Sequence, residues 1–303
     1  MSRLLGRCPG LYCGRIRSEN GELSDCGACP RGYKVSSTSE CILCEDSPSF
    51  YDFLYLGFMA LLLLILEWYI IDHTMKRRNF TKDIIFLHIS ALIENITSAI
   101  LTIILVKPIG FFSIHACGVK RLSDWYSLLH NPNPNYIGNL RCTQEVVYPL
   151  YSMVFIYFAL SLVIMLLIRP LLVLKFIDGK GKRSIYLTMY LIPILVVIHA
   201  TCAGLIYYSF PHIIIILSVI SIAAHLAFHL DQSMKSLLLT SVKDIRNLVI
   251  LLVHWMLHGY GIVAITQLKS PIFHCALLAL VPFPALFYIL TSKFTDPSKL
   301  HIE

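Results

Sequence analysis

The feature that most constrains this chain is a run of apolar residues at 53–71, which reads FLYLGFMALLLLILEWYII. Its nineteen residues rise about 28 Å as an α-helix, close to the roughly 30 Å hydrocarbon thickness of a bilayer. The eight residues before it contain acidic side chains and no basic ones, and a basic cluster follows it: Lys76, Arg77, Arg78 and Lys82. Because Lys and Arg are retained on the cytosolic side, we expect this span to run from the lumen into the cytosol.

Six further apolar segments follow at 84–106, 146–168, 185–208, 211–230, 247–266 and 272–292. With 56 % hydrophobic and 14 % charged residues, the chain belongs to the membrane class rather than to soluble domains. Only Ser209 and Phe210 separate the fourth and fifth segments, which favours a tight helical hairpin. The sequence therefore predicts an all-α polytopic membrane protein. It comprises a small cysteine-rich lumenal module at 1–52, seven transmembrane helices within 53–292 and a cytosolic tail at 293–303.

The basic residues support this topology. Seven spans with a lumenal N-terminus place the C-terminus in the cytosol, and most Lys and Arg residues near span ends then lie on the cytosolic side. Besides the cluster after the first span, the predicted cytosolic set includes Arg169, Lys180, Lys182 and Arg183. The net charge of +7 is spread between apolar segments and does not form one face, so it indicates topology and not nucleic-acid binding.

The N-terminal module holds six of the ten cysteines, namely Cys8, Cys13, Cys26, Cys29, Cys41 and Cys44. So short a loop-rich segment needs cross-links, because it cannot bury a sufficient apolar core. Two C-x2-C pairs are compatible with a four-thiolate zinc site. An oxidising lumen and an even count favour disulfides, in any of 15 pairings. In the loop after the second span, Cys117 and Cys142 predict one further bridge with each other, and two free thiols are the alternative.

Several ionisable residues fall inside predicted spans, where they usually face the interior of a helix bundle. We interpret Glu67, about one turn from the end of its span, as reaching the membrane surface. The others that bear on function are Glu94, His225, His229, His254 and His258. The histidines form two pairs spaced i, i+4, which could supply zinc ligands to an intramembrane hydrolase. There is no H-E-x-x-H motif, so hydrogen bonding between helices is the favoured role.

The stretch SMKSLLLTSVKDIR at 233–246, between the fifth and sixth spans, predicts an amphipathic helix on the cytosolic membrane surface.

Eight stretches along the chain resemble the Jun N-terminal kinase-associated membrane protein (JAMP) family. Those in the first half are LYCG at 11–14, CGACPRGY at 26–33, SPSFYDFLYLGFMA at 47–60 and LSDWYSLLHNPNPNY at 122–136. Those in the second half are EVVYPLYSMVFIY at 145–157, IRPLLV at 168–173, HWMLHGYGI at 254–262 and LALVPFPALFYILTSKFTDPSK at 278–299. None of them is a general chemical motif, so the resemblance is specific to this family.

The resemblance implies a multi-pass protein of the endoplasmic reticulum membrane that acts as an adaptor and not as an enzyme. The family is understood to draw the proteasome, a RING-type ubiquitin ligase and other components of endoplasmic-reticulum-associated degradation (ERAD) to misfolded proteins. It is also linked to the duration of stress-activated Jun kinase signalling. No cofactor and no catalytic, cofactor-binding or metal-binding residue is expected, and the partners are the lipid bilayer and these proteins. The alternatives are a seven-span receptor-like protein and the zinc hydrolase.

Overall fold

The computed structural model describes residues 7–8, 10–75, 81–127, 129, 142, 146–177, 181–229 and 231–295. The chain divides into two compact units, Met1–Tyr207 and Tyr208–Glu303, which are described separately. Helices dominate both units, and an N-terminal module cross-linked by disulfides belongs to the first. The predicted fold class, a helical membrane protein with a cysteine-rich module, is confirmed.

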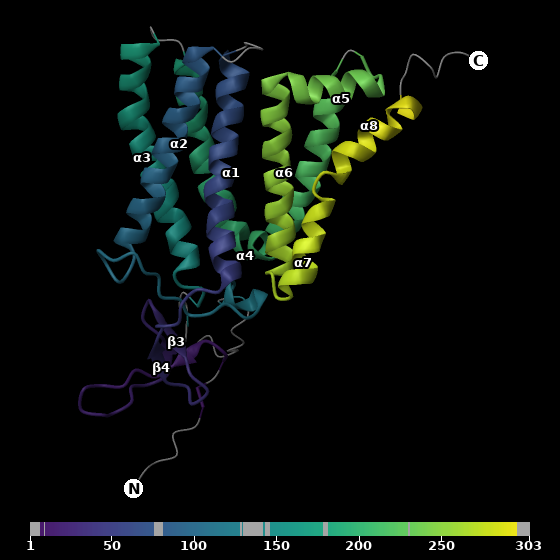
Figure 1. Cartoon of the computed structure of the whole chain (residues 1–303). Coiled ribbons are helices and arrows are strands. Elements are labelled where there is room, and N and C mark those ends of the chain that lie inside the picture. The colour runs from purple at the N-terminus through teal and green to yellow at the C-terminus, as the bar shows by residue number, and fades with distance from the viewer. Residues whose placement is uncertain are drawn as a thin grey trace. The chain divides into compact units, whose positions relative to one another are not determined.

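The N-terminal module contains four short strands in two antiparallel pairs. Strand β1 (Cys13–Gly14) pairs with β2 (Gly27–Ala28), and β3 (Tyr33–Val35) pairs with β4 (Cys41–Leu43). Gly14 is required here, because a Cβ at this position would lie 2.8 Å from the Sγ atoms of both Cys29 and Cys41. These strands lie at one end of the first three helices (Figure 1).

Four disulfides brace this end of the first unit. Two close the module on itself, Cys8–Cys26 and Cys29–Cys41. The other two, Cys13–Cys142 and Cys44–Cys117, join the module to the segment between the second and third helices. The predicted bridge between Cys117 and Cys142 is therefore wrong, because each of these residues is bonded to a cysteine of the module. Hydrophobic patterning identifies the spans but does not indicate which cysteines pair. The cross-links place the module and the segment on the same side of the membrane.

Three long helices of the first unit pack together and are long and apolar enough to cross a membrane (Figure 1): α1 (Phe50–Met75), α2 (Lys82–Leu105) and α3 (Leu150–Phe176). A short 3-10 turn, η1 (Leu122–Asp124), lies in the segment between α2 and α3. Buried Leu64, Leu87, Ala91, Met165 and Val173 pack together where the three helices meet. Helix α3 ends eight residues beyond its predicted span, because it continues through Pro170.

Helix α4 (Lys182–Ala227) is 46 residues long and contains both the fourth and the fifth predicted spans. Ser209 and Phe210, which separate these two predicted spans, are both helical. The boundary between the two units falls inside this helix, after Tyr207.

The second unit continues through α5 (Met234–Lys243), α6 (Ile245–Thr266), α7 (Pro271–Leu277), the 3-10 turn η2 (Leu278–Leu280) and α8 (Phe283–Thr295). Helix α5 is the predicted amphipathic helix. Its first turn is capped by Ser233, whose hydroxyl accepts a hydrogen bond from the Ser236 amide. Its buried Leu237 packs in a core with Leu226, Leu251 and Ile289.

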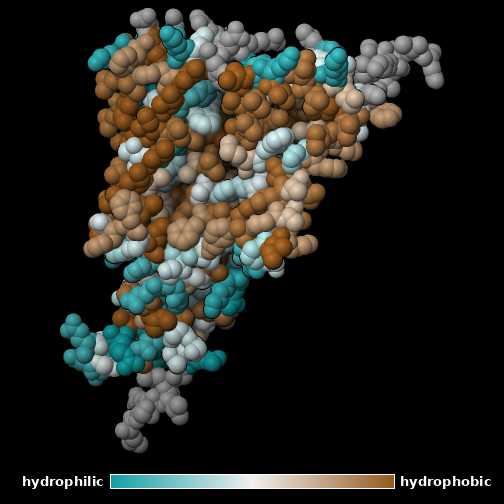
Figure 2. Space-filling model, in the orientation of Figure 1, coloured by the Kyte–Doolittle hydropathy of each residue, from teal (hydrophilic) through white to brown (hydrophobic). Residues whose placement is uncertain are grey.

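Six helical stretches in the described residues are long and apolar enough to cross a membrane. They comprise α1, α2, α3, α4, α6 and the stretch Pro271–Ser292, and α4 alone covers two of the seven predicted spans. Figure 2 shows apolar side chains over the helices and polar ones over the disulfide-bonded module.

Candidate functional site

The least expected feature of the first unit is an ion cluster buried between three helices. Arg169 of α3 donates from Nη2 to Oε2 of Glu94 on α2 at 2.6 Å and to Oε2 of Glu67 on α1 at 3.2 Å. Its Nε donates to the other oxygen of Glu94 at 3.2 Å, so the guanidinium binds this carboxylate with two donors. All three residues are at most 1 % exposed. The cluster therefore ties α1, α2 and α3 together at one depth.

Neutral side chains complete the hydrogen bonding of the cluster. The Asn95 amide donates to Glu67 Oε2 at 2.8 Å, and Ser90 donates to Glu94 Oε1 at 2.5 Å. The Tyr157 hydroxyl of α3 donates to Asn95 Oδ1. Because buried carboxylates are costly unless they are hydrogen-bonded, these donors belong to the same site as the arginine.

The cluster corrects two interpretations of the sequence. Glu67 does not reach the membrane surface, and Arg169 is not a solvated cytosolic charge, because each is the other's buried partner. The prediction ends the third span at residue 168 and therefore places Arg169 in the cytosol, yet α3 continues beyond it through Phe176. The sequence did contain a signal for this cluster: Glu67, Glu94 and Arg169 lie at similar depth in three neighbouring helices, where two acidic groups and one basic group can pair.

The cluster carries two carboxyl groups and one guanidinium, and its chemistry is that of a clamp. With both carboxylates ionised its net charge is −1. Each oxygen named above accepts a hydrogen bond from a fixed donor, and the Ser90 hydroxyl itself donates to Glu94 Oε1. Among the described residues no group of three His, Cys, Asp or Glu side chains could hold a metal.

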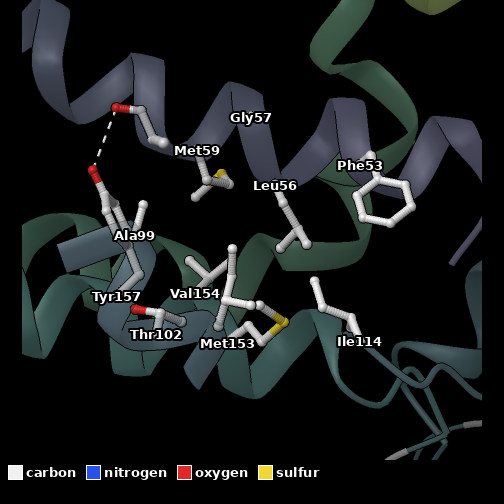
Figure 3. Close-up of a pocket in the computed structure, with 12 residues that line it drawn as sticks. Phe53, Leu56, Gly57, Met59, Ala99, Thr102, Ile114, Met153, Val154 and Tyr157 are labelled. Carbon is white, nitrogen blue, oxygen red and sulfur yellow. Dashed lines mark hydrogen bonds between the residues drawn. The ribbon is translucent and has the colours of Figure 1, made fainter. Parts of the chain in front are cut away.

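A cavity of about 250 Å³ lies between α1, α2 and α3, beside the cluster (Figure 3). Its walls are apolar apart from Thr102 and Tyr157, and the hydroxyls of both residues are hydrogen-bonded within the protein. Thr102 donates to the Ser98 carbonyl at 2.7 Å, and the Tyr157 hydroxyl, besides its bond to Asn95, lies 3.4 Å from the Ala60 carbonyl. The cavity thus fits an apolar group and presents no reactive side chain to it.

An aromatic layer closes the end of the first unit next to the module. The Trp125 ring, from the segment between α2 and α3, lies 5.8 Å from that of Tyr55 and 5.1 Å from that of Tyr207. Tyr207 donates to Asp52 at 2.6 Å, and the Tyr55 hydroxyl lies 3.4 Å from His199 Nδ1. Trp125 is only 9 % exposed, so the layer fixes the segment onto the helices.

The predicted intramembrane histidines lie in the second unit, whereas Glu94 lies in the first. His254 and His258 of α6 bond to two serines of α4: His254 Nε2 lies 2.7 Å from Ser221 Oγ, and His258 Nδ1 lies 3.1 Å from Ser218 Oγ. His254 Nδ1 is 2.7 Å from the Ile250 carbonyl, so this nitrogen carries the proton and Nε2 accepts from the serine.

The remaining predicted residues are placed as follows. The rings of His225 and His229 lie 5.5 Å apart and pack edge to face. Lys182 and Arg183 are exposed on the first turn of α4. The other predicted cytosolic residues, Lys76, Arg77, Arg78 and Lys180, lie outside the described residues. The eight candidate cysteines are all in disulfides, which leaves their thiolates unavailable for zinc.

A family model described as "JNK1/MAPK8-associated membrane protein" matches residues 8–297 of the chain. Curated proteins of this name from mouse and human are each 44 % identical over 304 residues, which covers 98 % of this chain and 96 % of each relative. A homologue from Caenorhabditis elegans is 30 % identical over 91 % of this chain and 85 % of its own length. The chain belongs to the JAMP family. No solved structure matches it.

Membership of the JAMP family bears on the character of the site. The relatives are named for association with a kinase and as membrane proteins, and none of these names denotes an enzyme. The ion cluster, the aromatic layer and the disulfides all join one part of the JAMP chain to another. Together they hold α1, α2, α3 and the module of the first unit in a fixed relation.

Proposed function

We propose that this JAMP-family chain is an adaptor of the endoplasmic reticulum membrane. It gathers the proteasome, a RING-type ubiquitin ligase and other ERAD components at sites where misfolded proteins are cleared, and it associates with Jun kinase. The observation that carries the proposal is the similarity, over 98 % of the chain, to relatives named for association with JNK1/MAPK8. The degradation partners are those that the family resemblance implies.

The construction of the first unit supports a scaffold. Charged groups join α1, α2 and α3 to each other, and two disulfides join the module to the segment between α2 and α3. An adaptor gains affinity when its binding surfaces are held in place before the partner arrives, because less conformational freedom is lost on binding. A rigid helical core of this kind suits a protein that positions others and performs no reaction.

The proposed orientation rests on redox chemistry and charge. Disulfides form and persist in the lumen of the endoplasmic reticulum and are rare in the cytosol. We therefore assign the module to the lumen, and the ends of the spans rich in Lys and Arg to the cytosol. Partner binding is then expected on the cytosolic side, where Lys182 and Arg183 are exposed.

The test is affinity purification of the tagged full-length chain in mild detergent from cells under endoplasmic reticulum stress. We expect proteasome subunits, a RING-type ligase and Jun kinase among the recovered proteins. The variant Lys182→Gln/Arg183→Gln should recover less of them. The variant Lys120→Gln/Arg121→Gln, two neighbouring basic residues on the predicted lumenal side, should recover the same amount as the unmodified chain.

Two outcomes would refute the adaptor. One is recovery of neither proteasome nor ligase subunits from stressed cells. The other is an unchanged half-life of a misfolded membrane substrate after the chain has been depleted. Recovery of Jun kinase alone would retain the kinase association and remove the role in degradation.

A further inference from the structure

A second cavity of the first unit combines charge with an apolar wall. Its volume is about 300 Å³, and it lies where the end of α2 and the start of α3 meet the disulfide-bonded module. Arg31 of the module and Lys107 contribute the charges. The apolar part of the wall includes Leu105, Ile109, Tyr148 and Ile156. The lining differs in this respect from the first cavity, which has no charged residue.

The position of Lys107 fixes the depth of this cavity in the membrane. Leu105 is the last residue of α2, a helix with the length and composition of a span, and Lys107 follows two residues later. A lysine at the end of a span places its ammonium group at the level of the lipid headgroups. The cavity therefore reaches from headgroup level down along the outermost turn of the helices.

The turn after α2 presents apolar side chains at the same level. Ile109, Phe111 and Phe112 are 66 %, 66 % and 72 % exposed. Gly110, with φ +85°, allows the chain to reverse here, and its amide donates to the Ile104 carbonyl at 2.9 Å. Large apolar and aromatic groups at the boundary of a bilayer insert between lipids. In a bilayer, this side of the cavity would therefore face lipid.

The second cation is brought to the cavity by the module. The Arg31 guanidinium carbon lies 5.7 Å above the centroid of the Tyr148 ring, at cation–π distance. Tyr148 is 5 % exposed and packs with Val106 and the bridge partners Cys44 and Cys117. Arg31 therefore stands on a surface that the disulfide holds in place. A guanidinium and an ammonium above an apolar wall match a phosphate that carries an acyl chain.

We propose that this cavity binds an anionic phospholipid from the leaflet on the module's side. The phosphate lies between the Arg31 guanidinium and the Lys107 ammonium, and one acyl chain follows Leu105 and Ile156. Two cations favour a lipid whose headgroup has a net negative charge, because the amine of a zwitterionic headgroup is repelled by them. The site goes beyond the proposed adaptor role and does not depend on it.

Native mass spectrometry of the full-length chain in mild detergent tests the proposal by titration with phosphatidylinositol and, separately, with phosphatidylcholine. We expect tighter binding of phosphatidylinositol. One basic residue near an anionic headgroup corresponds to about a five-fold change in affinity, so Lys107→Ala should weaken this binding about five-fold. Lys120→Ala is the matched control. This lysine is exposed in the same segment and does not line the cavity, so binding should not change.

A second variant, Arg31→Gln, should weaken the binding by a similar factor with an unchanged thermal transition, and Arg31→Lys should restore part of it. Equal losses in Lys107→Ala and Lys120→Ala would overturn the site in favour of diffuse attraction. Unchanged binding in a folded Lys107→Ala/Arg31→Gln double variant would overturn it as well. If millimolar inorganic phosphate displaced the lipid, Arg31 and Lys107 would form a site for a free anion, and the lipid site would be refuted.

Discussion

The two units join their helices by different chemistry. In the first, α1, α2 and α3 meet at a guanidinium and two carboxylates that are almost wholly buried. In the second, α6 meets α4 through imidazole–hydroxyl pairs, His254 with Ser221 and His258 with Ser218. A buried charge without its partner is far more costly than an unpaired hydroxyl. The stability of the first unit therefore depends on α1, α2 and α3 being packed together. In the second unit, a single contact can be removed at a smaller cost in stability.

The first unit is also cross-linked by disulfides, and removing one of them should cause a large loss of stability. The Cys13–Cys142 bridge closes a loop with a sequence separation of 129, and the Cys29–Cys41 bridge one of only 12. With the Cys29–Cys41 and Cys44–Cys117 bridges intact, the loop that Cys13–Cys142 closes is shortened to about 45 residues; chain entropy then assigns about 4 kcal/mol to it and about 3 kcal/mol to the short one. The double variant Cys13→Ser/Cys142→Ser should therefore lose more stability than Cys29→Ser/Cys41→Ser. The free energy of unfolding in a detergent titration measures both, and equal losses would contradict the prediction.

The ion cluster provides the second test. Arg169→Met leaves Glu67 and Glu94 buried without their cation, and should destabilise the chain by about 3–5 kcal/mol. The triple variant Glu67→Gln/Glu94→Gln/Arg169→Met removes every charge and should restore most of the loss. Thermal unfolding of the purified protein compares them, with Arg183→Met, an exposed residue of α4, as the control. A triple variant no more stable than Arg169→Met would show that the charges themselves are needed.

Two glycines of α6 test the packing in the second unit. A Cβ on Gly261 would lie 2.5 Å from Ile215 Cγ1 and 3.1 Å from the Pro211 carbonyl oxygen of α4, whereas a Cβ on Gly259 would meet nothing closer than 3.7 Å. Gly261→Ala should therefore cost about 1–3 kcal/mol through overpacking. Gly259→Ala, two residues earlier, should be neutral or gain up to about 1 kcal/mol from helix propensity. Thermal unfolding distinguishes them, and two equal shifts would refute the close approach of α6 to α4.

The imidazole–hydroxyl contacts should matter less. His254→Phe removes the bond to Ser221, and single hydrogen bonds between membrane helices contribute about 0.6 kcal/mol on average. The shift in thermal unfolding should therefore be several-fold smaller than that of Arg169→Met. His274→Phe serves as the control, because its Nδ1 accepts only from the amide of Ser270, four residues earlier in the same segment. If His254→Phe lowered the thermal transition as much as Arg169→Met does, the proposed difference between the two units would be refuted.

These contacts explain what the sequence could and could not predict. Hydropathy is a local property, so it located the spans, the module and the amphipathic helix near 233–246. Pairing is set by the fold, and neither the partner of Cys117 nor that of Arg169 is encoded in neighbouring residues. Arg169 was misplaced for a physical reason. A charged residue near a span end is ordinarily solvated, and only acids on two other helices make its burial favourable.

The smallest effect is expected at the surface of the module, where the Lys34 ammonium binds the Asp46 carboxylate. The hydrogen bond and the charge of Lys34 lower the pKa of Asp46 below its usual value. This contribution to stability is therefore present above the pKa that Asp46 has in the unfolded chain, and it is lost as the pH falls through the lowered, folded-state pKa. Asp46→Asn should reduce the thermal transition slightly at pH 7, since exposed pairs contribute little. The difference from the unmodified chain should vanish in acid, and a difference that grows as the pH falls would contradict this assignment.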